Sequence, residues 1–278
     1  MPRQKRTEVS RLKVDGRVLK LKWEELTADE LAELSKRDDV VVVIPIGSLE
    51  KHGPHLPLGT DGLTVYEIAL KASEIEPCII LPPLFYSYVA DMRQFPGAIN
   101  IREDLLLNLL ENICEEVSRN GFKKILIVNG HGGNVSLLRL FTASRLTKRT
   151  DYSLYVLAEP WAFEQKVLQE IKETDEIGHA CEIETSFMLY LRPELCRMER
   201  VKPAKTKPRP LSGIPTITPV DWVVYCPEGY VGDPGKATKE KGRKLVEAFI
   251  NGLVETIRKI KEDKVVGETV KLLGLDKL

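Results

Sequence analysis

Apolar residues along this chain fall into two patterns, short unbroken runs and runs with helical spacing. Val40 to Ile46 and Ile125 to Val128 are continuous aliphatic segments, typical of strands that are buried on both faces of a sheet. Apolar residues recur every four positions from Leu105 to Val117 and predict an amphipathic helix that Gly121 ends. The alternation of such strands and helices indicates an α/β fold, with a mostly parallel sheet sandwiched between helices.

The remaining elements follow from the same reasoning. Thr27 to Glu30 has the capping-box pattern that starts a helix. Further helices are expected over residues 61–73, 134–148, 160–172 and 179–191 and from about residue 236, and further strands over 78–81 and 153–158. Residues 201–220 hold five prolines and should run over the surface. We therefore expect a polar N-terminal arm over residues 1–20 and one domain over residues 21–278.

Composition narrows the possible partners. A hydrophobic fraction of 43% allows a large core, and 41 basic against 41 acidic residues give no electrostatic reason to expect nucleic acid or an anionic membrane. The five cysteines are odd in number, widely spaced and without a CxxC pair, which favours reduced thiols. The basic N-terminus precedes no apolar signal segment, and no run of 18 apolar residues occurs. We expect a soluble cytoplasmic protein with a small-molecule substrate.

All four histidines, His52, His55, His131 and His179, lie in or beside turns that follow strands or begin helices. Each has a carboxylate or a glycine cluster within a few residues. In an open α/β sheet, ligands bind beyond the carboxyl ends of the strands, where such turns gather. This concentration predicts one functional site.

The segment from Gly47 to Asp61 has the highest density of candidate metal ligands in the sequence. Glu50 and His52 are two residues apart, so an extended loop would point both the same way. Mixed imidazole and carboxylate ligands suit Zn²⁺, Mn²⁺ or Fe²⁺. The alternative is that Asp61 only caps a helix and Glu50 is solvated. His55, among prolines, is expected to be structural or to bond a ligand carboxylate.

Two more segments add candidates. His131 follows a buried strand within Asn129 to Asn134, where glycines allow close backbone approach; phosphate binding is the alternative, although the spacing fits no phosphate loop. If a helix starts at His179, then His179 and Glu182 share a face and Glu184 lies on another. The alternatives are an ordinary acidic first turn and a nucleophilic Cys181.

These segments together resemble the creatininase family, also called creatinine amidohydrolases. The resemblance covers residues 44–69, Phe95-Pro96-Gly97, and residues 121–134 and 179–189, and continues weakly over residues 232–242. It implies two divalent metal ions per chain, with Asp61 bridging them, Glu50 and His131 on one ion, and His52 and Glu184 on the other. It further implies that His179 handles protons, that Glu182 occupies an acidic position common among relatives, and that the chains form homo-oligomers, usually hexamers.

One departure from the family pattern bears on the substrate. Creatininase proper has Tyr-Glu where this chain has Gly132-Gly133, which argues against creatinine. The resemblance is therefore to the Gly-Gly branch of the family, whose members act on formamides of pyrimidine intermediates, on modified peptides or on cyclic ketones from inositol breakdown. The expected activity is binuclear metal-dependent hydrolysis of an amide, formamide or cyclic amide C–N bond, with substrate contacts from residues 85–97. The alternatives are hydrolytic ring opening of a cyclic diketone, a catalytically silent metal-binding scaffold, and a nucleotide-binding module.

Overall fold

The protein is built on one four-stranded parallel sheet. We analysed a computed structural model that describes residues 13–14, 17–18 and 21–277. The strands are β3 (Val41–Ile46), β4 (Ile79–Ile80), β5 (Lys124–Asn129) and β6 (Ser153–Leu157), in the spatial order β4-β3-β5-β6. Every pair is parallel, with Val42 opposite Ile125 and Ile125 opposite Leu154. The predicted α/β fold with a parallel sheet is confirmed.

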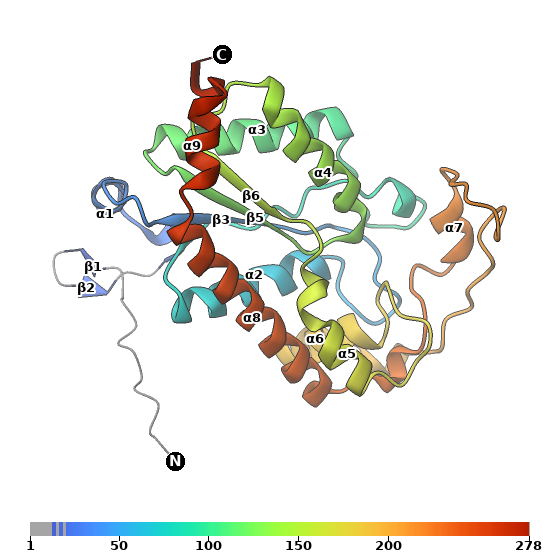
Figure 1. The fold of residues 1–278 in the computed structure, drawn as a ribbon. Coiled ribbons are helices and arrows are strands. Elements are labelled where there is room, and N and C mark those ends of the chain that lie inside the picture. The colour runs from blue at the N-terminus through green and yellow to red at the C-terminus, as the bar shows by residue number, and fades with distance from the viewer. Residues whose placement is uncertain (1–12, 15–16, 19–20, 278) are drawn as a thin grey trace.

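Helices cover both faces of this sheet (Figure 1). The helices are α1 (Ala28–Leu34), α2 (Thr60–Ile75), α3 (Glu103–Arg119), α4 (Val135–Ser144), α5 (Gln165–Ile171), α6 (Glu182–Leu191), α7 (Asp221–Tyr225), α8 (Lys239–Glu262) and α9 (Val265–Leu272). Helices α2, α5, α6 and α8 lie on one side and α3 and α4 on the other. The expected capping box of α1 is present, with Thr27 accepting from the backbone of Glu30.

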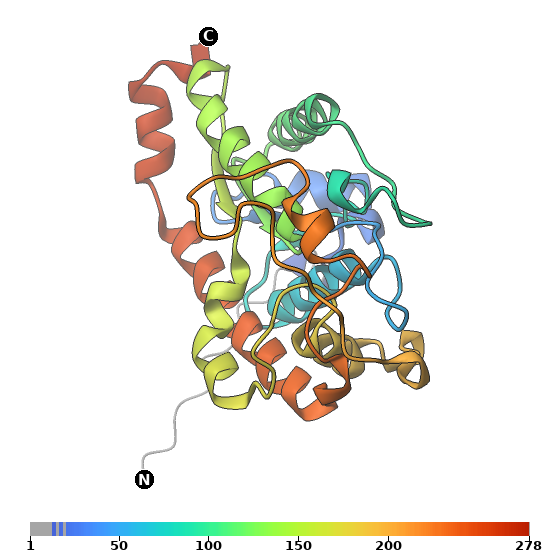
Figure 2. The ribbon, with the colours of Figure 1, turned by 90° about the vertical axis from the view of Figure 1, so that its right-hand side faces the viewer.

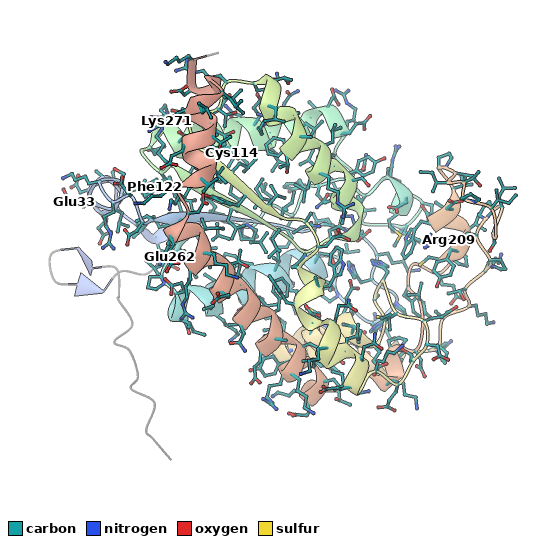
Figure 3. All side chains as sticks on the ribbon, in the orientation of Figure 1. Glu33, Cys114, Phe122, Arg209, Glu262 and Lys271 are labelled. Atoms are coloured by element: carbon teal, nitrogen blue, oxygen red, sulfur yellow. The ribbon has the colours of Figure 1, made fainter. Side chains whose placement is uncertain are left out.

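The alternation of side chains along each strand produces two cores. Val41 and Val43 face the α2 and α8 side, whereas Val42 and Ile44 face the α3 and α4 side. Cys114 and Phe122, labelled in Figure 3, belong to this second core. Each fully buried aliphatic side chain stabilises the fold by about 1.5–3 kcal/mol, which explains the continuous apolar runs.

Helix α8 positions α6 through a close backbone contact. A Cβ atom at Gly242 would lie 1.9 Å from the carbonyl oxygen of Ser186, so only glycine allows the two helices this approach. Thr238 caps α8, and its own backbone N–H donates to the Ser186 hydroxyl. Helix α6 is therefore held against α8 at Ser186, two residues after Glu184.

Some boundaries differ from the sequence prediction. The segment expected as one helix over residues 160–172 begins with a 3₁₀ turn, η5 (Pro160–Glu164), before α5. The helix expected from residue 179 begins only at Glu182. Residues 201–220 are largely irregular and exposed, as predicted, and Figure 2 shows this segment and α7 as an excursion outside the helical layers.

Only part of the N-terminal segment is described by the structure. Most of the arm expected over residues 1–20 lies outside the described residues; within it, β1 (Lys13–Val14) and β2 (Arg17–Val18) pair antiparallel. Among the described residues no helix combines the length and apolarity needed to cross a membrane.

Candidate metal centre

The predicted site residues gather beyond the carboxyl ends of the two central strands. β3 ends at Ile46 and leads into the loop that carries Glu50 and His52, and β5 ends at Asn129, two residues before His131. The side chains of all three site residues are almost fully buried. The sheet edge named by the sequence analysis is therefore where the candidate chemistry lies.

Two glycines let the start of α2 enter between these strand ends. A Cβ atom at Gly47 would lie 2.1 Å from the backbone nitrogen of Gly62, and one at Gly130 would lie 2.6 Å from the carbonyl oxygen of Asp61. The first turn of α2 thus packs directly on both strand ends. This contact places the Asp61 side chain between the loop after β3 and the turn after β5.

Asp61 uses its two carboxylate oxygens on two different histidines. Oδ1 lies 2.8 Å from Nε2 of His52, and Oδ2 lies 2.9 Å from Nδ1 of His131. The Ser48 hydroxyl donates to Oδ2 over 2.7 Å and fixes the carboxylate plane. The N-cap of α2 is Gly59, so the alternative in which Asp61 merely caps the helix is wrong.

Glu50 and Glu184 flank this carboxylate on opposite sides. Oε1 of Glu50 lies 2.8 Å from Nδ1 of His131, and Oε2 of Glu184 lies 3.8 Å from Nε2 of His52. Among the described residues, three groups of three have ligand atoms within 4.8 Å of one another: Glu50–Asp61–His131, His52–Asp61–Glu184 and Glu50–His52–His179. Asp61 belongs to the first two, the arrangement expected of a bridging carboxylate.

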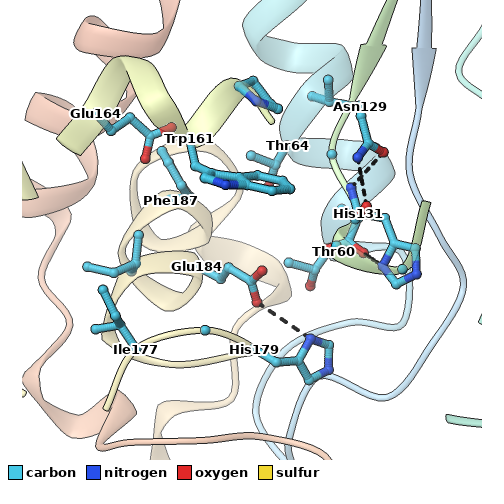
Figure 4. Close-up of a pocket in the computed structure, with 18 of the residues that line it drawn as sticks. Thr60, Thr64, Asn129, His131, Trp161, Glu164, Ile177, His179, Glu184 and Phe187 are labelled. Atoms are coloured by element: carbon cyan, nitrogen blue, oxygen red, sulfur yellow. Dashed lines mark hydrogen bonds and ion pairs between the residues drawn. The ribbon is translucent and has the colours of Figure 1, made fainter. Parts of the chain in front are cut away.

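His179 faces the same cluster from a strained turn. Its Nδ1 lies 4.0 Å from carboxylate oxygens of both Glu50 and Glu184 (Figure 4). The next residue, Ala180, has a φ of 47°, a left-handed conformation that residues other than glycine rarely adopt. This turn directs the Ala180 N–H to Glu184 and separates His179 from the axis of α6.

All three histidines present one nitrogen to the cluster and bond the other to a backbone carbonyl. The outer nitrogens of His52, His131 and His179 lie 3.2, 3.0 and 2.6 Å from the carbonyl oxygens of Glu50, Tyr88 and Lys51. A carbonyl only accepts, so each outer nitrogen carries a hydrogen and the inner one has a lone pair when the ring is neutral. Outer-shell bonds of this kind orient metal-binding histidines.

The electrostatics of the cluster favour a cation. Burial alone would lower the pKa of His52, but the neighbouring Asp61 carboxylate outweighs it and raises this pKa to about 10. Burial is likewise outweighed at His131, where Glu50 and Asp61 raise the pKa well above its usual value, and at Asp61, whose pKa the two histidines hold well below its usual range. Carboxylates and imidazoles arranged in this way fit a transition-metal site.

Glu182 is not brought to this cluster. Its side chain is fully buried and accepts from the backbone N–H groups of Glu173 and Thr174, from the Thr174 hydroxyl and from Lys241. The expectation that His179 and Glu182 share a helix face is wrong, because α6 begins three residues after His179. The catalytic role that the family resemblance implied for Glu182 is not supported by the position of its side chain.

His55 and Cys181 also lie outside the cluster. His55 bonds the Thr185 hydroxyl over 2.8 Å, so the expected bond to a ligand carboxylate is absent and the structural interpretation holds. Cys181 is buried at the N-cap of α6, where burial raises the pKa of its thiol to about 11. A protonated, enclosed thiol argues against a nucleophile.

A pocket of about 540 Å³ opens beside the cluster. Several of its lining residues were not singled out by the sequence analysis, namely Trp161, Glu164, Ile177, Phe187 and Trp222. Of residues 85–97, expected to contact substrate, only Asp91 lines the pocket. Pro160 and Trp161 lie three and four residues beyond the end of β6, so the strand-end rule could have identified that part of the wall.

The parallel sheet and the buried carboxylate–imidazole cluster define an α/β protein with a candidate metal centre. Comparison with known proteins gives the family, since the family described as creatininase, creatinine amidohydrolase, matches residues 24–257. The protein belongs to the creatininase family.

Two relatives and one solved structure illustrate this membership. The chain is 27% identical over 253 residues to creatinine amidohydrolase of Pseudomonas putida, covering 84% of this chain and 95% of that protein. It is 26% identical to the 3-dehydro-scyllo-inosose hydrolase of Thermotoga maritima, covering 86% and 83%. A crystal structure of creatinine amidohydrolase, 26% identical, superposes with a TM-score of 0.75 over 88% of this chain and 99% of that one.

Proposed function

We propose that the protein is a binuclear metal-dependent hydrolase that cleaves an amide, formamide or cyclic amide C–N bond of a small molecule. The observation that carries this proposal is the pair of ligand groups sharing Asp61, whose two oxygens face different histidines. Glu50 and His131 would hold one ion, and His52 and Glu184 the other. When bound, two such ions lower the pKa of a water molecule and polarise a carbonyl oxygen.

The protein's own residues would supply orientation and proton transfer. His179 presents Nδ1 to the cluster while its Nε2 is held by the Lys51 carbonyl, so Nδ1 can accept a proton and return it to a leaving nitrogen. The ring of His179 packs 4.3 Å from that of His52 and edge-on to Trp222, which limits its rotation. The apolar wall of the pocket excludes water around the scissile bond.

The identity of the ions is a narrower proposal within this scheme. Histidine and carboxylate ligands accommodate Zn²⁺, Mn²⁺ and Fe²⁺ alike. Similar solved structures carry the titles "Creatininase Mn" and, for a variant, "Zn-Zn type". We propose two ions per chain, with zinc and manganese as the first candidates.

Creatinine itself is disfavoured as the substrate. A Cβ atom at Gly133 would lie 2.4 Å from Nε2 of His131 and 2.9 Å from the Tyr88 carbonyl oxygen. Position 133 of this turn therefore has no room for the Glu side chain that creatininase proper carries there, whereas a Cβ atom at position 132 would meet no atom within 4 Å. A cyclic diketone is the second candidate substrate, favoured by the similarity to the inosose hydrolase over most of both chains.

Product analysis with the metal-loaded and chelator-treated enzyme tests the reaction. Formamides and cyclic amides should release formate, an amine or a ring-opened acid, and chelation should abolish this release. Exclusive opening of keto-inositols would replace amide hydrolysis with the second candidate. If metal-loaded protein turned over neither class, the proposed hydrolysis would be contradicted.

We also propose that the protein is cytoplasmic and forms homo-oligomers. Leu105 and Leu109 on α3 are 50% and 38% exposed, and Leu140 on α4 and Leu146 just beyond it are 59% and 63% exposed. Exposed apolar groups of this size favour a homo-oligomer, a hexamer by family resemblance. All five cysteines are free, and the reducing cytoplasm would keep them so.

A further inference from the structure

Carboxyl groups and histidines are the charged and titratable side chains that line the pocket among the described residues. Five carboxylates border it, those of Glu50, Asp61, Asp91, Glu164 and Glu184, whereas no lysine or arginine among the described residues does. Glu50, Asp61 and Glu184 belong to the candidate metal centre and would be neutralised there. The two carboxyls that remain, those of Asp91 and Glu164, favour a cationic substrate group over an anionic one such as phosphate.

Glu164 is a buried acid without a partner in the described part of the chain. The residue is 3% exposed, and no hydrogen bond or ion pair joins its carboxyl to any other described residue. Burial raises the pKa of this carboxyl well above its usual value, and the nearby charge of Glu184 adds to the effect. Buried carboxylates are ordinarily paired, so a partner from outside the protein is indicated.

The surroundings of Glu164 define the space in which such a partner would lie. Figure 4 shows Glu164 across the pocket from His179, with Glu184 between them and the Trp161 indole beside the carboxyl. Trp161 and Glu164 come from the same 3₁₀ turn, η5, and Phe187 packs below them. An indole face next to a carboxylate is a favourable environment for an ammonium or guanidinium group.

We propose that the substrate carries a protonated nitrogen, an amine or a guanidinium, at the end remote from the scissile bond, and that Glu164 and Trp161 bind it. This inference rests on the proposed function for the position of the scissile bond. The cation would supply the charge that Glu164 lacks. Phosphorylated substrates would be excluded, because the pocket offers them no basic side chain.

Matched inhibitors test this assignment. Alkyl hydroxamic acids share a metal-chelating head, and a series with tails of two to six carbons can end in an ammonium, a hydroxyl or a carboxylate group. Calorimetry on the zinc-loaded enzyme should show that the best ammonium tail binds at least about tenfold more tightly than its hydroxyl counterpart, with the carboxylate tail weakest. Glu164→Gln should remove this preference while keeping the shape of the side chain.

The control is Glu170→Gln, which removes one exposed carboxylate from α5, the helix that follows Glu164, and should leave the preference unchanged. Equal affinity for ammonium and hydroxyl tails at every length, or a preference that survives Glu164→Gln, would overturn the inference and leave the metal centre intact. If no hydroxamate bound at all, both the metal centre and the inference that rests on it would be contradicted. Thermal melting of each variant checks that it folds.

Discussion

Two regions of this molecule bury carboxylates, and the protein neutralises them differently. At the start of α6, the Glu182 carboxylate accepts hydrogen bonds from Lys241 and from two backbone N–H groups. These bonds outweigh the effect of burial and lower the pKa of its carboxyl. In the pocket, Glu164 has no such partner among the described residues, and burial raises its pKa. Glu50, Asp61 and Glu184 there face histidines, the Ser48 hydroxyl and the Ala180 N–H, and no lysine or arginine among the described residues bonds them.

The difference separates a structural from a functional use of buried charge. Lys241 is held beside Glu182, because its ammonium group also donates to Glu173 and to the Lys236 carbonyl. The Glu182 carboxylate is therefore not available to a ligand. A metal ion can displace the protons of the imidazoles, and an unpaired carboxyl can bind a cationic group of a ligand. The carboxyl groups of the pocket are thus left for metal ions and a cationic substrate group to neutralise.

The largest expected effect is on turnover in the pocket. His179→Ala should lower kcat by about 10²- to 10⁴-fold, the range typical of a lost general acid–base group, while metal content stays at the wild-type value. Steady-state kinetics and elemental analysis of the same preparation measure both. Loss of one ion in this variant would instead make His179 a metal ligand, as its grouping with Glu50 and His52 also permits.

The Glu182 region should respond in stability and not in metal binding. Lys241→Ala leaves the fully buried Glu182 carboxylate without its cation and should destabilise the fold by about 3 kcal/mol. Lys244→Ala, at an exposed position of the same helix, should change stability by less than about 0.5 kcal/mol. Urea unfolding compares the two; a metal-depleted but equally stable Lys241→Ala protein would invalidate the contrast between the regions.

A pair of neighbouring glycines sharpens the description of the metal centre. An alanine methyl at position 133 would collide with the His131 ring and the Tyr88 carbonyl, whereas at position 132 nothing lies within 4 Å of the added carbon. Gly133→Ala should therefore weaken metal affinity by about 10- to 100-fold, and Gly132→Ala should not. Competition with a metal-binding dye gives both affinities, and equal values would show that the bond from His131 to Tyr88 does not orient the ring.

The smallest effect concerns the pH dependence of stability. Because burial raises the pKa of Glu164, its carboxyl ionises at a higher pH in the folded protein than in the unfolded chain, where it ionises above about pH 4.5. Stability should then fall as pH rises above this value, by an amount on the order of 1 kcal/mol. Glu164→Gln lacks this loss, so it should melt above the wild type at pH 7.5 and together with it at pH 4. The same melting difference at both pH values would be inconsistent with an unpaired carboxyl.

The fold and most of the metal centre were predictable because each depends on local patterns. Continuous apolar runs identify strands buried on both faces, and parallel strands bring their carboxyl ends together, so Glu50, His52 and His131 had to meet. The assignment of Asp61 and Glu184 as ligands came instead from the family resemblance. It is consistent with the two groups that share Asp61 and remains a proposal.

What the sequence did not reveal depends on contacts between distant segments. Spacing alone cannot show that α6 starts at Glu182, which moves His179 off the helix and turns Glu182 toward Lys241, 59 residues away. The pocket wall likewise joins Trp161 and Phe187 from separate elements, and Glu164 is informative only because no partner reaches it. Such absences are visible only in the assembled fold.

The most direct test of the account is the metal content of protein purified without a chelator or a histidine tag. Elemental analysis should find close to two equivalents of zinc, manganese or iron per chain, and Asp61→Ala should lose both ions because this carboxylate belongs to both ligand groups. A single equivalent in the wild type after incubation with excess metal, or an Asp61→Ala variant that keeps both ions, would contradict the binuclear centre.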